Sequence, residues 1–384
     1  MSGSMYLPDA HVSTLVAQIK KLDHKENDTI LLLVAEHSTF DLQALLTALK
    51  EQDVPVAGGV FPGIIYGNCK YDAGIVAHVL PVMAKASVIT GLENSDFQLD
   101  HLPDFPDKQQ YTALVLVDGL TKHVALFLDR LFRHLGNTTR YIGGGAGSLS
   151  FVQKPCVFDS EGIYQDAALV LWLKTTVGLG VRHGWKRLRG PFVATNTDGP
   201  VVQKLGNQPA FQVYSQIVNM VSGKTLTKEN FFSIAKEYPL GIYHPGMDYI
   251  VRDPITFTDE GALVCVGEVP ARSMIYILRG EKKSLIDNAH LATSEAMSDA
   301  LSQAGNHNLI VDCISRVLYL EHEFSKELDA VVAALPEGAS TPFGMLSLGE
   351  IATFKTGRVE FFNKTFVVGA LQDIPSPLAV PPTP

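Results

Sequence analysis

Two histidines stand where an imidazole could be presented to a ligand. His183 directly precedes Gly184-Trp185, in a segment otherwise poor in apolar residues. His244 lies in a turn that the following Pro245-Gly246 pair would hold open. A neutral imidazole facing an apolar pocket is the usual axial ligand of haem iron. A structural or solvated role remains the alternative for both side chains.

Other polar residues interrupt apolar surroundings. Arg252 follows a strand-like segment, and its guanidinium could bind a carboxylate or phosphate through two parallel hydrogen bonds. A structural ion pair with the adjacent Asp253 is the alternative. Glu350 and Asn363 each stand at the start of a predicted strand and could line a pocket. Both could equally hydrogen-bond their own backbone in a turn.

A run of glycines, Gly143-Gly144-Gly145, carries more glycine than one turn requires. Because glycine lets backbone approach a ligand closely, Gly144 and Gly145 join the candidate binding residues. Turn geometry alone is the alternative. The run resembles a phosphate-binding loop only loosely, since no Gly-Lys-Ser/Thr follows it.

Motifs for catalysis and for metal binding are missing from the sequence. We find no nucleophile elbow, no HExxH pair and no convincing pair of catalytic carboxylates. The four cysteines stand singly, without a CxxC zinc pair or a CxxCH haem-attachment site. We therefore expect a non-catalytic protein whose thiols are buried in a reducing compartment.

Charge and hydropathy exclude several classes of partner. The formal net charge of −9 argues against a nucleic-acid-binding surface. No apolar run reaches the roughly 18 to 20 residues that span a bilayer. The N-terminus lacks the basic and apolar regions of a secretory signal. We expect a cytoplasmic protein without membrane insertion.

The chain contains an internal repeat that must position these residues. Each copy has a buried strand, an amphipathic helix, a glycine-bearing segment that we interpret as a strand end and turn, and a further strand. The third copy is weaker than the first two. The copies are 29–34, 42–49, 58–59 and 73–80; 112–117, 124–135, 143–145 and 167–173; and 309–312, 324–335, 343–344 and 364–370.

A distinct section separates the second copy from the third. Segment 181–206 predicts a hairpin or a crossing segment, and the apolar spacing of 209–221 predicts a helix. Strands and turns alternate over 254–278. The small residues of 284–304 predict one long helix packed closely on a sheet.

Each unit buries one face of its strands, so the copies should pack around shared sheets. We predict an α/β protein in which repeated strand-helix-strand units form packed mixed sheets flanked by helices. We place an N-terminal domain at 25–205 and a C-terminal domain at 206–372. The tail 373–384 has five prolines and is expected to be disordered.

An ordered series of these segments resembles the N- and C-terminal parts of the FIST sensory domain, over about residues 25 to 372. One departure is Gly63-Ile64-Ile65, where the family often carries Gly-Glu-Ile. The matching segments are Ile142–Gly145, Gly180–Trp185, Tyr238–Gly241, Ile250–Pro254, Ala289–Ala296, Gly349–Ile351 and Asn363–Thr365.

The resemblance implies a ligand-sensing protein that acts on a signalling partner in trans, because no output domain follows residue 372. Stand-alone FIST proteins of the NosP type imply haem, nitric oxide as the gas ligand and a partner histidine kinase. On that reading His183, next to Trp185, is our first choice as iron ligand, and His244 is the second.

Two alternatives to the haem sensor stay open. A FIST sensor of a small polar ligand such as an amino acid would use Arg252 for the carboxylate and Glu350 for the ammonium group. An enzyme on the repeated scaffold is the other, although no catalytic constellation supports it.

Overall fold

Three units of the same topology form the body of the molecule in the computed structural model, which describes residues 3–100, 102–103, 111–245, 248–300, 307–354 and 357–373. In each unit the first strand pairs in parallel with the second strand and antiparallel with the last. The predicted repeat and α/β class are confirmed. The units are β2 (Asp28–Ala35), α2 (Leu42–Lys50), β3 (Val56–Phe61) and β6 (Ile75–Pro81); β8 (Tyr111–Asp118), α3 (Val124–Leu135), β9 (Thr139–Ala146) and β12 (Ala168–Leu173); and β21 (His307–Cys313), α7 (Ile314–Leu320), α8 (Phe324–Ala334), β22 (Phe343–Ser347) and β25 (Phe366–Asp373).

The helices form where the apolar residues recur at helical spacing. In α3, Val124, Phe127, Leu128 and Leu131 are buried on one face, which is the i, i+3, i+4, i+7 pattern. The helix ends at Gly136, whose φ of 72° lies in the region that favours glycine. The core face of α3 packs on its own unit's strands, which include β8 and β12.

Each unit also lends a hairpin to a neighbouring unit. The first unit's hairpin, β4 (Gly63–Tyr66) and β5 (Cys69–Tyr71), extends the third unit's sheet through β22. The second unit's hairpin, β10 (Val157–Asp159) and β11 (Ile163–Tyr164), pairs with β3. The third unit's hairpin, β23 (Glu350–Thr353) and β24 (Val359–Phe362), pairs with β9. The exchange closes the three units into a ring.

Each of the three sheets therefore has six strands. Three come from its own unit, two from the borrowed hairpin, and one further strand lies at the other edge. These edge strands are β1 (Ser4–Leu7), β7 (Ser87–Ile89) and β13 (Thr175–Arg182). Helix α1 (Val12–Ile19) packs beside α2. Among the described helices, none has the length and apolar character to cross a bilayer.

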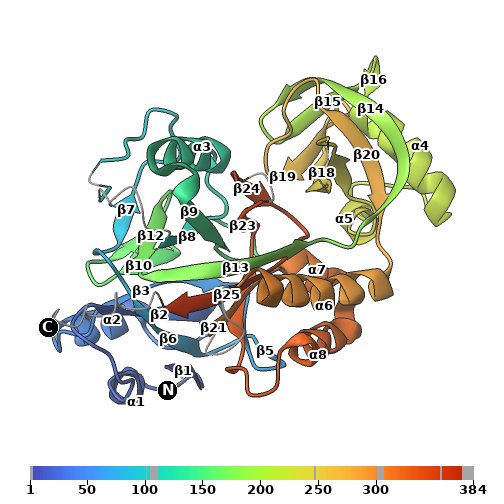
Figure 1. Ribbon diagram of the computed structural model, residues 1–384. Helices are drawn as coiled ribbons and strands as arrows, with labels where there is room; N and C mark the ends of the chain where they lie inside the picture. Colours follow the sequence, from blue (N-terminus) through green and yellow to red (C-terminus); the bar gives the residue numbers. More distant parts are fainter. Residues whose placement is uncertain are drawn as a thin grey trace, which may run out of the picture.

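A separate sheet stands apart from the body at the upper right of Figure 1. Its strands run in the order β14-β20-β17-β18-β19-β15-β16, and a β14–β15 pairing closes it, so we call residues 186–279 the barrel. The predicted boundary at 205/206 falls within it. The barrel's elements are β14 (Lys186–Asp198), β15 (Val201–Leu205), β16 (Gln208–Pro209), α4 (Ala210–Ser222), α5 (Phe231–Ala235), β17 (Leu240–Ile242), β18 (Ile250–Phe257), β19 (Leu263–Val266) and β20 (Met274–Arg279).

The chain returns to the body through α6 (Lys282–Asp299), which packs on β13. A Cβ on Gly180 of β13 would lie 1.7 Å from the carbonyl oxygen of Ala292, so the predicted close packing is confirmed. The helix ends at residue 299 rather than 304, and residues 301–306 lie outside the described part. The predicted disordered tail also lies outside it, apart from Asp373 at the end of β25.

The glycine run was predicted to form a turn, and that prediction was wrong. Gly143, Gly144 and Gly145 lie within β9, between β8 and the borrowed strand β23. A Cβ on Gly143 would lie 1.8 Å from the Val115 carbonyl oxygen, and one on Gly145 would lie 2.5 Å from that of Leu348. Gly145 is needed where the backbone of the third unit meets β9, whereas Gly143 is needed where β9 lies against β8 of its own unit.

We predict that Gly145→Ala destabilises the folded protein by about 1–3 kcal/mol, because the added methyl group would push Leu348 away. Urea unfolding followed by circular dichroism measures the change. Gly162→Ala is the matched control, since the nearest atoms to its Cβ are 3.8 Å away. A Gly145→Ala protein as stable as this control would contradict the packing role.

Candidate ligand-binding site

A cavity of about 260 Å³ lies where the barrel meets the body. The body contributes the segments that follow β8 and β21, together with Gly349 and residues of β24. The barrel contributes α5, β18 and β19. The wall is mainly apolar, and its hydrophobic residues include Leu120, Val124, Phe151, Phe232, Ile255, Leu348 and Phe361.

Arg252 brings a buried cation to this wall. Its Nε donates to the Glu268 carbonyl (2.8 Å), and its Nη1 donates to the carbonyls of Val251 (3.1 Å) and Phe361 (3.0 Å). For Nη2, the nearest acid among the described residues is Glu360, at 3.9 Å. Burial lowers the pKa of Arg252, yet a guanidinium stays protonated. Nη2 is thus a charged donor available to a ligand.

Asp253 does not form the predicted alternative pair with Arg252. Its Oδ2 instead accepts from Ser315 Oγ (2.6 Å) and lies 3.2 Å from the Lys364 ammonium group. Burial raises the pKa of Asp253, against the effect of Lys364. The guanidinium is therefore not neutralised by its neighbour in sequence.

Two buried acceptor atoms of the cavity residues have no hydrogen-bond partner within the described structure. They are Oδ1 of Asn363 and Oδ1 of Asp253, and both residues are about 1% exposed. Burying an acceptor without a partner costs free energy, so native proteins rarely leave one unsatisfied. A ligand that carries N–H or O–H donors would satisfy them.

The N-terminus of α3 adds positive potential on the body side. Val124 and Ala125 of its first turn line the cavity, and the N-cap residue His123 makes no side-chain cap. The first amides of a helix have no partner within the helix, and the helix dipole favours an anion there. The helix end and Arg252 therefore favour an acidic group in the same cavity.

Glu350 lies behind the cavity wall rather than in it. The carboxylate accepts from Ser347 Oγ (2.8 Å) and from the Thr365 backbone N–H (3.1 Å). The adjacent Gly349 lines the cavity, whereas Glu350 does not. Burial raises the pKa of Glu350 to about 8. The structure thus brings Arg252 and Asn363 together but separates Glu350 from the cavity. Gly144 and Gly145 are also absent from its lining.

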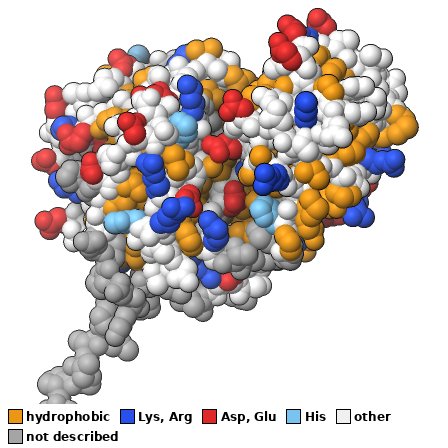
Figure 2. Space-filling model, turned by 90° about the horizontal axis from the view of Figure 1, so that it is seen from above, with side chains coloured by type: hydrophobic (Ala, Val, Ile, Leu, Met, Phe, Trp, Pro, Cys, Tyr) orange, Lys and Arg blue, Asp and Glu red, His pale blue; other side chains and the backbone are white. Residues whose placement is uncertain are grey.

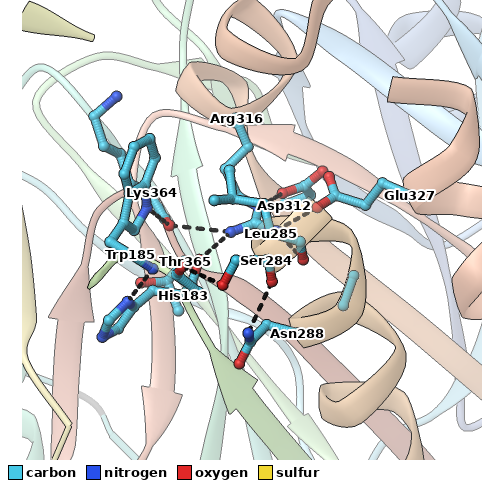
Figure 3. Close-up of polar contacts among 12 residues, drawn as sticks. His183, Trp185, Ser284, Leu285, Asn288, Asp312, Arg316, Glu327, Lys364 and Thr365 are labelled. Carbon is cyan, nitrogen blue, oxygen red and sulfur yellow. Dashed lines mark hydrogen bonds and ion pairs between the residues drawn. The ribbon is translucent and has the colours of Figure 1, made fainter. Parts of the chain in front are cut away.

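His183 is only 4% exposed, and both of its ring nitrogens face partners. Nδ1 accepts from the Trp185 backbone N–H (2.9 Å), and Nε2 lies 2.8 Å from the Asp248 carboxylate. Burial alone would raise the pKa of Asp248, but the hydrogen bond from His183 lowers it below its usual range. Trp185 in turn donates to the Lys364 carbonyl at 2.9 Å (Figure 3).

These residues do not fit a haem group. Because Nδ1 of His183 accepts the Trp185 N–H, the proton of a neutral ring is on Nε2, which faces Asp248, and neither nitrogen offers a lone pair to iron. His244 is half-buried in the loop between β17 and β18, and no histidine lines either described cavity. Among the described residues, no cluster of three His, Cys, Asp or Glu side chains could hold a metal ion.

A buried charge network next to the cavity was missed by the sequence analysis. Arg316 is fully buried and forms ion pairs with Asp312 and Glu327 (Figure 3). Its guanidinium also donates to the carbonyl oxygens of His183 (2.6 Å) and Leu285 (3.2 Å). The available signal was a set of charged residues inside apolar, strand-like and helical segments.

A second cleft, of about 690 Å³, lies between α6, β13 and β23. Each charged side chain of this cleft already has an ion-pair partner. Arg140 pairs with Asp299 within the cleft, and Glu295 pairs with Arg182, which lies outside its lining. Since these charges are already satisfied, the smaller cavity is the better candidate site.

Comparison with known families agrees with this architecture. The FIST N domain model matches residues 28–208, and the FIST C domain model matches residues 210–353. The chain therefore belongs to the FIST family. FIST domains are sensory domains of signal transduction, so the chain is a sensor rather than a member of a catalytic family. No curated protein matches the chain.

We predict that Glu350→Gln reduces the loss of stability as pH rises. The ordinary pKa is 4.5 and the folded value is about 8, so the folded state holds a proton that the unfolded state releases between them. Stability from this group is therefore complete below about pH 4.5 and falls as pH rises towards about 8. The variant's melting temperature, relative to wild type, should increase across this range.

Glu360→Gln is the matched control, because its side chain is 34% exposed. A constant difference in melting temperature between Glu350→Gln and wild type from pH 5 to 8 would contradict the assigned protonation.

Proposed function

We propose that the protein senses a small molecule that carries both a carboxylate and hydrogen-bond donors, such as an amino acid. The observation that carries this proposal is the cavity shared by Arg252 and Asn363. Nη2 of Arg252 makes no hydrogen bond in the described structure and has Glu360 at 3.9 Å, and Oδ1 of Asn363 has no described partner. The sensor passes its state to a signalling protein in trans.

The wall chemistry supports this ligand class. A carboxylate is favoured by Arg252 and by the N-terminus of α3. An ammonium or amide group would satisfy Asn363 Oδ1 and Asp253 Oδ1. The apolar wall suits a short hydrophobic side chain. The volume, about 260 Å³, is below the range of about 300–1,000 Å³ of drug-sized sites, which favours a small metabolite.

The site's position supports a sensing role. Arg252 belongs to the barrel, whereas Asn363, Ser315 and α3 belong to the body. A ligand that contacts both parts stabilises the arrangement in which they lie together, and so shifts the population of states. A partner that binds one arrangement more tightly would read that shift.

The family likeness to haem-based nitric-oxide sensors gives a second hypothesis, in which the partner is a histidine kinase. No contact among the described residues favours it over the cavity ligand, because His183 Nδ1 accepts the Trp185 N–H and Nε2 lies against Asp248. Hemin is therefore included as a separate probe below.

We predict that a screen of the standard amino acids will find at least one that raises the melting temperature. Stabilisation by a ligand grows with its concentration relative to Kd. Isothermal titration should then show that Arg252→Lys weakens binding about tenfold or more, because lysine cannot place a donor at Nη2. The methyl ester of the same amino acid should bind poorly, since it lacks the carboxylate.

Arg358→Lys is the matched control, because Arg358 is exposed and lies outside the cavity. Ala125→Leu, which would fill the cavity, is a second test that leaves Arg252 in place. Equal binding by wild type and both cavity variants would overturn the assignment. A stoichiometric Soret band with hemin that disappears in His183→Ala would favour the haem sensor instead.

A further inference from the structure

The outer face of the barrel carries a row of exposed apolar and aromatic side chains. Val193 of β14 pairs directly with Met274 of β20, and the Tyr243 N–H donates to the Met274 carbonyl (2.9 Å). These three side chains are 43%, 40% and 36% exposed, respectively. Val193 and Met274 lie on the neighbouring strands β14 and β20, and Tyr243 directly follows the next strand, β17, whereas Ile275 beside Met274 belongs to the core.

Two further, less exposed tyrosines adjoin this row: Tyr249 is half-buried, and Tyr276 is only 9% exposed. The ring centroids of Tyr243 and Tyr249 are 6.4 Å apart, and those of Tyr249 and Tyr276 are 5.3 Å apart. We call Val193, Tyr243, Tyr249, Met274 and Tyr276 the outer patch. Figure 2 shows hydrophobic and basic side chains next to one another on the barrel side of the molecule, at the right.

Four arginines that form no ion pair in the described structure lie on or next to the strands of this patch. Arg187 and Arg189 belong to β14, Arg272 precedes β20 by two residues, and Arg279 ends β20. The Arg187 guanidinium lies 5.6 Å from the Tyr276 ring centroid.

The acids near the patch form no ion pair with Arg187 or Arg189 in the described structure, although the charge of Arg279 acts on Glu281. Asp248 lies against His183, and Glu281 pairs with Lys186 at 2.6 Å. By contrast, the surface arginines Arg133, Arg140, Arg182 and Arg358 each form an ion pair. The positive charge around the outer patch is therefore left for an external anion.

We propose that the outer patch is a docking surface for an acidic segment of a partner protein. Tyr, Met and Arg are the residues enriched in protein interfaces, and Tyr and Arg supply many of their strongest contacts. Carboxylates of the segment pair with Arg187 and Arg189, and its apolar side chains cover Met274 and Tyr243. A nucleic acid is a poorer match, because the chain's overall negative charge repels it.

The patch and the cavity share one sheet, because Leu240 of β17 pairs with both Arg252 of β18 and Ile277 of β20. The docking surface nevertheless stands independently of the proposed ligand, since its argument uses none of the cavity contacts.

The test uses a labelled synthetic peptide in which glutamate alternates with leucine and phenylalanine. Fluorescence anisotropy with the full chain should show binding that weakens with salt, since exposed charge pairs are screened. Arg187→Glu combined with Arg189→Glu should weaken binding about tenfold or more. Met274→Ser should weaken binding while leaving the salt dependence in place.

Lys20→Glu combined with Lys21→Glu is the matched control, because it reverses two exposed charges on the far unit. Circular dichroism checks that each variant is folded. The proposal is overturned if a peptide with lysine in place of glutamate binds as tightly, if the arginine variant binds like the control, or if no binding occurs. Binding only to vesicles of equal phosphatidylserine and phosphatidylcholine would also overturn it, in favour of a membrane.

Discussion

Two hydrogen bonds between the second and third units set the position of the whole site. The Gly145 N–H donates to the Gly349 carbonyl, and the Leu348 N–H donates to the Gly145 carbonyl, both at 2.8 Å. Such an approach is possible only where the facing strand has no side chain, which is why glycines occupy the middle of β9. Because Leu348 and Gly349 line the cavity, this contact also fixes the floor against which a ligand would rest.

The ring of three units is symmetric in topology, but its chemistry is not. By register, Ile64 pairs with Met345, Val157 with Gly59 and Glu350 with Gly144, so the three borrowed hairpins place these residues at corresponding points. Two of them are apolar, and only the third carries a carboxyl group. The barrel also enters the chain just before the third unit. The candidate site therefore lies where the repeat is broken, because there the polar side chains of the third unit meet a second wall, which the barrel supplies.

The spacing of residue types along the chain predicted those features that depend on interactions within one segment. The helix over Val124–Leu135 followed from its apolar face, and Arg252 and Asn363 stood out as polar residues in apolar segments. Glycines in a turn and glycines in a strand that another backbone approaches closely look alike in sequence, so the glycine run of β9 was wrongly predicted to be a turn. The state of His183 depended on Asp248, a contact between distant segments that spacing does not reveal. The separation of Glu350 from the cavity likewise depended on which way one strand faces.

The buried charges beside the cavity matter more for orientation than for net stability. Replacing a buried ion pair with apolar groups is often neutral, whereas removing one partner is strongly destabilising. Lys364 illustrates the consequence: its ammonium group contacts Asp253 (3.2 Å) and the Lys236 carbonyl (3.0 Å) and lies over the Trp185 ring (4.9 Å). Its φ of 54° is uncommon for a residue with a side chain, and these contacts hold it there. Because Asn363 immediately precedes Lys364, the same contacts hold the backbone from which the Asn363 amide, and so the acceptor that a ligand would meet, projects.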